Sequence, residues 1–233
     1  MKVAIMQPYL FPYIGYWQLI ATADTFILLD DVNYICRGWI NRNRYYCDGR
    51  IQFFNFPIIN ASQNRRICET QLLYTIKQRD NMKRTFSYAY RNAPYLYQTM
   101  EQIAPLLSDA ETDLTAYVEK TICRICQYLR IDTPIIRASN LRPSKHSAGE
   151  TGIIELCKTL EADTYINPIG GKDIYHRDRF TQEGIQLIFL SPNYDAIRTV
   201  IGDTPADLSI IDLMMRLDHI TINRILYKCC SFL

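Results

Sequence analysis

The chain has 233 residues, of which 48% are hydrophobic and 21% are charged, a composition that excludes disordered and low-complexity proteins. The 26 Lys and Arg residues against 24 Asp and Glu residues give a net charge of +2, too small a basic surplus for a nucleic-acid-binding protein. We expect one globular domain over residues 1–233, since α/β folds of this length fill a single core.

The N-terminus begins in an apolar segment without a signal-peptide pattern, and no apolar run approaches the roughly 20 residues that span a bilayer. These features predict a cytoplasmic protein with no membrane insertion. The eight cysteines are therefore expected to be free thiols. Cys123 and Cys126 have the spacing of zinc ligands, but no second pair accompanies them, and we assign no metal site.

The N-terminal residues predict a strand over 2–6, a helix over 15–23 and a buried strand over 25–29. This order favours two parallel strands joined by a right-handed crossover. In open sheets of this kind, ligands bind beyond the carboxyl ends of the strands.

Residues 39–57 form two strand-like stretches around Asp48-Gly49, which predicts a β-hairpin. Residues 78–129 have helical periodicity with a break near Pro94 and form a helical subregion. Shorter elements follow: strands near 133–138, 163–167 and 185–190, a helix over 149–160, and two short helices near 208–215 and 220–227. The expected fold is therefore α/β, with a parallel-sheet Rossmann-like core, a β-hairpin and a helical insertion.

The loop from Gln7 to Tyr16 is the richest candidate site. Its prolines stiffen the chain between strand and helix, its tyrosines can stack on a ring, and helix amides after Gly15 suit a phosphate or carboxylate. The alternative is an aromatic turn that only packs. The candidate substrate-binding residues are Gln7, Pro8, Tyr9, Pro12 and Gly15, and Tyr16 is a candidate catalytic residue.

Asp30 and Asp31 follow the second strand, where one carboxylate could bind a metal, act as a base or simply cap the loop. Neighbouring residues on an extended stretch point to opposite faces, so only one is expected to face a site. Asp30 is the preferred base, because partial burial after an apolar strand would raise its pKa. Asp31 is the second choice.

Between Arg37 and Arg44, guanidinium, amide and aromatic groups alternate, a mixture that can clamp phosphates and stack on a base or sugar. The alternative is a charged hairpin edge that resists aggregation. Arg42 is expected to reach a phosphate or carboxylate through its bidentate fork. The candidate binding residues are Trp39, Asn41, Arg42 and Asn43.

Two later loops are weaker candidates. Lys145 and His146 precede a predicted helix and could close over an anion or merely cap that helix, with His146 a candidate catalytic group. Gly170 and Lys172 follow a strand in a second candidate phosphate loop, which lacks a Walker pattern.

The motifs Gln7 to Tyr16, Asp30-Asp-Val32, Trp39 to Asn43 and Leu208 to Asp212 together resemble the WbqC-like family over almost the whole chain. Asp163 to Tyr165 and the stretch from Gly170 to Tyr175 agree in order with that family's late strand and loop. The resemblance implies a role in surface polysaccharide and O-antigen biosynthesis. It implies transfer of glycine or a related aminoacyl group to a nucleotide-linked amino sugar.

The segment from Phe11 to Tyr16 is also similar to the strand-end loop of nucleotidylyltransferases and pantothenate synthetase, which carry a His-x-Gly-His type signature. Tyr13 and Tyr16 stand at the two histidine positions. A phenol with a pKa near 10 cannot supply an imidazolium charge, so this similarity implies the fold and not adenylyl transfer.

Two functions follow as hypotheses. The first is an aminoacyl transferase or amide-forming ligase, whose donor is activated by ATP or as a thioester on a carrier protein, with a nucleotide-linked amino sugar as acceptor. The second is a non-catalytic nucleotide-sugar binding protein. In either, one pocket at the carboxyl edge of the sheet is expected to collect a set of residues from successive strand ends: Gln7, Tyr9, Gly15, Tyr16, Asp30 and Asn41.

Overall fold

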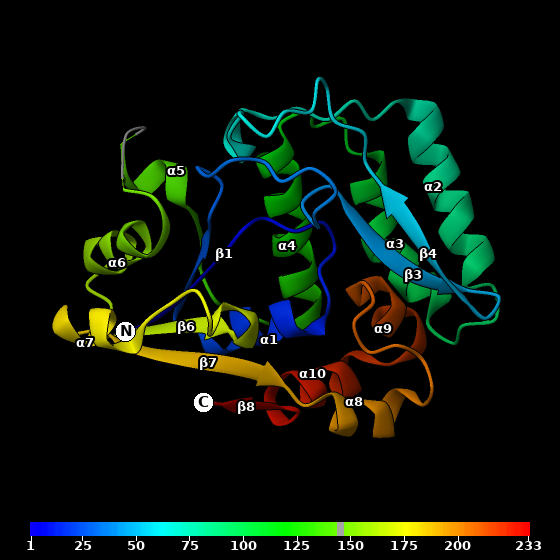
Figure 1. The fold of residues 1–233 in the computed structure, drawn as a ribbon. Coiled ribbons are helices and arrows are strands. Elements are labelled where there is room, and N and C mark those ends of the chain that lie inside the picture. Colours follow the sequence, from blue (N-terminus) through cyan, green and yellow to red (C-terminus); the bar gives the residue numbers. More distant parts are fainter. Residues whose placement is uncertain (144–146) are drawn as a thin grey trace.

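A six-stranded sheet runs through the computed structural model, which describes residues 1–143 and 147–233 (Figure 1). Its strand order is β5-β2-β1-β6-β7-β8, in which the first five strands are parallel and β8 pairs antiparallel with β7. This confirms the predicted α/β fold with a mostly parallel Rossmann-like sheet. The strands are β1 (Lys2–Met6), β2 (Thr25–Leu28), β5 (Ile135–Arg137), β6 (Thr164–Pro168), β7 (Gln186–Pro192) and β8 (Cys230–Phe232).

The order of the strands places a switch point beside β1. From β1 the chain adds β2 and then β5 on one side, and it then returns to add β6 and β7 on the other side. The loops that leave the carboxyl ends of β1 and β6 therefore diverge. A crevice for ligands opens at such a point in α/β sheets.

Side chains of each central strand alternate between two hydrophobic cores. Val3 and Ile5 pack in the core under α6 (Gly149–Thr159) and α7 (Arg177–Gln182), whereas Ala4 packs in the larger core on the opposite face. That larger core contains α1 (Ile14–Thr22), on which Trp17 is completely buried. Burial of both faces explains why the strands read as continuous apolar runs.

The predicted helical subregion consists of α2 (Ile76–Ala89), α3 (Leu96–Ser108) and α4 (Leu114–Leu129), and the break predicted near Pro94 separates α2 from α3. The predicted hairpin is formed by β3 (Arg42–Cys47) and β4 (Arg50–Asn55). At its turn, Asp48 and Gly49 both have positive φ angles, 47° and 77°, as a two-residue hairpin turn requires. In Figure 1 the hairpin lies beside α2 and α3, away from the main sheet.

The C-terminal part adds α8 (Tyr194–Ile201), α9 (Ile210–Arg216) and α10 (His219–Lys228). The sequence predicted the last two helices but missed α7, α8 and β8. Shorter turns of helix are η1 (Ile67–Glu69), α5 (Ala138–Leu141) and η2 (Ile169–Gly171). All eight cysteines are free thiols, and no helix among the described residues has the length and apolar character needed to cross a membrane.

A buried polar contact joins the helical subregion to α9. The Tyr90 hydroxyl donates to Asp212 Oδ1 at 2.9 Å, and Arg216 Nε donates to Asp212 Oδ2 at 3.0 Å. Burial raises the pKa of Asp212, while Arg216 and Tyr90 oppose that shift. The carboxyl group of Asp212 therefore relies on both partners to replace its lost hydration.

We predict that Tyr90→Phe lowers the free energy of unfolding by about 1–3 kcal/mol, because it leaves one oxygen of a buried carboxyl group without its donor. Urea unfolding followed by circular dichroism measures this change. Tyr88→Phe is the matched control, since the Tyr88 side chain is 60% exposed. Equal stabilities of the two variants would contradict the contact's contribution.

Candidate functional site

A cavity of about 330 Å³ lies at the switch point between β1 and β6. Met6, Gln7 and Tyr9 line it from the β1 side, and Gly170 and Gly171 line it from the β6 side. A second cavity of about 520 Å³ shares Leu29 and Tyr175 with the first and extends toward Asp31 and Arg142. We call the two adjoining cavities the sheet-edge crevice.

Gln7 and Gly170 present open polar groups to this crevice. The Gln7 side-chain amide makes no hydrogen bond with the part of the chain that the structure describes, although it lines the cavity. Around Gly170, nothing lies within 4 Å of the position that a Cβ atom would occupy. A ligand can therefore approach the backbone there closely.

Asp31 borders the crevice in a bidentate ion pair. Arg142 Nε and Nη2 donate to its two carboxylate oxygens at 2.5 and 2.9 Å, and the side chains of Arg142 and Asp31 are only 7% and 3% exposed. Arg142 Nη1 also donates to the Gly152 carbonyl at 2.9 Å. The pair thereby joins the loop after β2 to α6 and fixes one wall of the crevice.

Asp30 points elsewhere. Its side chain is completely buried, lines neither cavity, and accepts hydrogen bonds from the Ser139 backbone N–H at 2.9 Å and the Ser139 hydroxyl at 2.7 Å. Burial raises the pKa of Asp30, and the Ser139 hydrogen bonds partly oppose this. The two carboxylates diverge as the alternation of side chains along an extended stretch requires, but it is Asp31 that faces the crevice.

We call the loop over residues 7–13 the aromatic loop. Side chains from other elements hold it in place by donating hydrogen bonds to its carbonyl oxygens. Asn43 Nδ2 donates to the carbonyls of Leu10 and Phe11 at 2.9 and 2.8 Å, and the Ser209 hydroxyl also donates to Phe11 at 2.8 Å. The Trp17 indole N–H donates to the Pro12 carbonyl at 2.9 Å. These contacts hold Phe11 at a φ of 43°, which is unusual for a residue with a side chain.

Gly15 and Tyr16 hold the start of α1 in place. A Cβ atom at Gly15 would lie 2.5 Å from Tyr13 Cε2 and 2.8 Å from Pro192 Cγ. The buried Tyr16 hydroxyl donates to the Gln7 carbonyl at 2.9 Å, and burial raises its pKa well above the usual value. Of the six residues predicted to share one pocket, Gln7 and Tyr9 line the first cavity of the crevice, and Gly15, Tyr16, Asp30 and Asn41 do not.

Asn41 and Arg42 are engaged with the hairpin. The Asn41 amide donates to the Phe56 carbonyl and accepts from the Tyr34 hydroxyl. Arg42 Nε donates to the Gly38 carbonyl at 3.1 Å and Nη2 donates to the Arg37 carbonyl, so its guanidinium holds the preceding turn.

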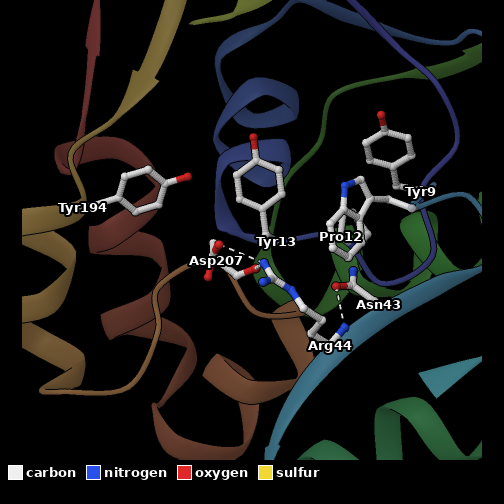
Figure 2. A pocket seen from close by; sticks show the side chains of 8 residues that line it. Tyr9, Pro12, Tyr13, Asn43, Arg44, Tyr194 and Asp207 are labelled. Atoms are coloured by element: carbon white, nitrogen blue, oxygen red, sulfur yellow. Dashed lines mark hydrogen bonds and ion pairs between the residues drawn. The ribbon is translucent and has the colours of Figure 1, made fainter. Parts of the chain in front are cut away.

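A further cavity of about 260 Å³ lies on the other side of Tyr9, and we call it the aromatic pocket (Figure 2). Arg44 and Asp207 form an ion pair in its wall, with Arg44 Nη2 2.8 Å from Asp207 Oδ2. Trp39 and Asn43 were predicted site residues, whereas Arg44, Tyr194 and Asp207 were not assigned. The lining residues are Tyr9, Pro12, Tyr13, Trp39, Asn43, Arg44, Tyr194 and Asp207.

The remaining predicted residues have different surroundings. Pro8 is buried, and Lys172 is exposed and lines none of these three cavities. Lys145 and His146 lie outside the described residues. Arg44 could have been found by its place in the run that begins at Arg37, but no local signal in the sequence marks Tyr194 or Asp207.

Comparison with known proteins assigns this chain to a family. The model of the WbqC-like protein family matches residues 7–223, which include the whole aromatic pocket and all of the crevice except Ile5 and Met6. The chain belongs to the WbqC-like family. This WbqC-like protein is 28% identical over 219 residues to an uncharacterized protein of Mycobacterium tuberculosis, Rv1507c, with 91% of this chain and 92% of the relative covered. No solved structure matches this chain.

For this WbqC-like protein we predict that Gly15→Ala lowers the free energy of unfolding by about 1–3 kcal/mol, because the added methyl group must displace Tyr13 and Pro192. Gly170→Ala, where the same atom meets open space, should leave stability unchanged. Thermal and urea unfolding of both variants make the comparison. A Gly15→Ala variant as stable as the parent would show that the β1–α1 turn is less tightly packed.

Proposed function

We propose that this chain is a transferase or ligase of surface polysaccharide (O-antigen) biosynthesis that attaches glycine or a related aminoacyl group to the amino group of a nucleotide-linked sugar. The observation that carries the proposal is the crevice at the switch point between β1 and β6, the position at which α/β sheets bind nucleotides. Membership in the WbqC-like family supports the substrate class.

The reaction needs an activated acyl donor, because amide formation from a free carboxylate is uphill in water. The amine nitrogen attacks the acyl carbon, a C–N bond forms, the bond to the leaving group breaks, and the nitrogen loses a proton. ATP can activate the carboxylate as an acyl phosphate or adenylate, and a carrier protein can supply it as a thioester. In each case the activated acyl carbon must reach the amino group of the acceptor.

Two cavities that share one lining residue suit an acceptor with two parts, a nucleotide and a sugar. Tyr9 lines both the sheet-edge crevice and the aromatic pocket, and its ring lies 5.7 Å from that of Tyr16. In this proposal the nucleotide occupies the crevice, where the Gln7 amide and the backbone at Gly170 contact it. The sugar then extends past Tyr9 toward the aromatic pocket.

A non-catalytic nucleotide-sugar binding protein is the second candidate function. The environment of Asp31, the carboxylate that borders the crevice, favours this function, because two hydrogen bonds join Asp31 to Arg142. Both oxygens of Asp31 already accept hydrogen bonds from the Arg142 guanidinium, so this carboxylate is engaged in holding the wall of the crevice. The same ligand would then bind without reacting.

Mass spectrometry distinguishes these functions. The full chain is incubated with nucleotide-linked amino sugars, glycine and ATP, or with a glycyl thioester, and we expect an acceptor whose mass increases by one glycyl residue. Gly170→Leu should reduce both product formation and nucleotide-sugar affinity by about tenfold or more, because a bulky side chain would cover the backbone that this proposal places against the nucleotide. Gly170→Ala is the matched control and should stay close to the parent.

Saturable binding of the nucleotide sugar without any product would contradict the transferase and favour the non-catalytic binding protein. Undiminished affinity in Gly170→Leu would exclude the sheet-edge crevice as the nucleotide site, whichever function is correct.

Asp30→Asn distinguishes a structural role for Asp30 from its predicted role as base. Asn keeps one acceptor oxygen but places an NH2 group where the second carboxylate oxygen accepted from Ser139, and the charge-assisted hydrogen bonds are lost. We expect the free energy of unfolding to fall by about 1–3 kcal/mol. Urea unfolding and the turnover assay are measured on the same preparation. Unchanged stability with abolished turnover would restore Asp30 as the proton acceptor.

A further inference from the structure

The aromatic pocket offers a negative charge among aromatic rings. Asp207 has a half-exposed side chain, 50% accessible, while its partner Arg44 is only 20% accessible. Arg44 is also covered on one face, because its guanidinium lies 5.0 Å from the centre of the Trp39 ring. The carboxylate is therefore the more accessible charge of this ion pair.

One oxygen of Asp207 is available. Arg44 Nη2 donates to Oδ2 at 2.8 Å and to the Asp207 backbone carbonyl at 3.0 Å, while Oδ1 has no hydrogen bond with the described residues. The rings of Tyr13 and Tyr194 stand beside this side chain (Figure 2). Burial first, and the charge of Asp207 in addition, raise the pKa of both phenols, so both rings stay neutral.

We infer that the aromatic pocket is a binding site for a primary ammonium group carried on a sugar ring, with Asp207 as its counter-ion. Aromatic faces attract cations through their quadrupole, and a carboxylate oxygen accepts a charge-assisted hydrogen bond from an ammonium group. Pro12 and the tyrosine rings provide apolar walls for the C–H faces of the ring. The choice of a sugar as carrier rests on the proposed function.

The frame of this pocket is fixed before a ligand arrives. The Ser209 backbone N–H donates to the Arg44 carbonyl at 3.0 Å, and Ile210 donates to the Pro12 carbonyl at 2.9 Å. These bonds join the hairpin, the aromatic loop and the segment that carries Asp207. A preformed pocket loses little ordering entropy on binding, which favours even a small ligand.

The test compares three sugars on the full chain: D-glucosamine, N-acetyl-D-glucosamine and D-glucose. Trp39 is one of only two tryptophans and lines the pocket, so its fluorescence reports occupancy, and saturation-transfer NMR provides an independent measure. We expect glucosamine to bind at least about tenfold more tightly than the other two, because only it carries an ammonium group. Equal affinities, or no saturable binding of glucosamine at millimolar concentration, would overturn the inference.

Asp207→Asn should abolish the preference for glucosamine, whereas Asp207→Glu should retain part of it. Asp195→Asn is the matched control, because Asp195 follows Tyr194 directly, is 95% exposed and lines none of the three cavities. Urea unfolding checks that each variant is folded, and the comparison of sugars on the parent chain needs no variant. If the preference for glucosamine persists in Asp207→Asn, a group other than Asp207 binds the ammonium group.

This result is separable from the proposed function. If no acylated product forms, the proposed transferase function is excluded, but a preference for glucosamine would still support the ammonium site. Product formation by Asp207→Asn with unchanged kcat and KM for the amino sugar would remove Asp207 as the counter-ion and leave the transferase intact.

Discussion

The two hydrogen bonds from the Asn43 amide to the carbonyls of Leu10 and Phe11 are the constraint on which the sheet-edge crevice and the aromatic pocket depend. A loop with prolines at both ends cannot satisfy its own carbonyl groups, and buried carbonyls without donors are costly. Asn43 supplies two donors from β3, and the Asn43 Oδ1 atom accepts from the Arg44 N–H at 2.8 Å. The hairpin is thus attached to the main sheet through the loop that follows β1.

This attachment determines where ligands can lie. Tyr9 lies in the aromatic loop between two carbonyl contacts, those at Gln7 and Leu10, and it lines both the crevice and the aromatic pocket. The Asp31–Arg142 pair does the same on the far side of the crevice by joining the loop after β2 to α6. Buried ion pairs of this geometry give orientation rather than net stability.

The sequence predicts the fold well because its periodicity follows local rules. The apolar runs of β1 and β2, the Asp48-Gly49 turn and the break at Pro94 each depend on nearby residues alone. The short strand β8 escaped prediction, because Cys230–Phe232 has too few residues for a pattern and forms only by pairing with β7. The site was less predictable still. Whether Asp30 or Asp31 faces a cavity depends on a contact with Ser139, and the place of Arg44 depends on a contact with Asp207, both from distant segments. Arg42 instead bonds to Gly38 in the turn just before it, and nothing in the residue types foretells that choice.

These outcomes change how the motifs of this chain are interpreted. The polar groups of Asn41, Arg42 and Asn43 are directed at backbone carbonyls, so the run of amides and guanidinium groups that suggested a phosphate clamp acts mainly as a scaffold. A group already used by the protein cannot also bind a ligand without losing its first partner. Among the described residues, the Gln7 amide in the crevice and Asp207 Oδ1 in the aromatic pocket are two groups that remain available to a ligand. A ligand that used both would have two linked parts, one in each cavity, and a nucleotide joined to an amino sugar has two such parts.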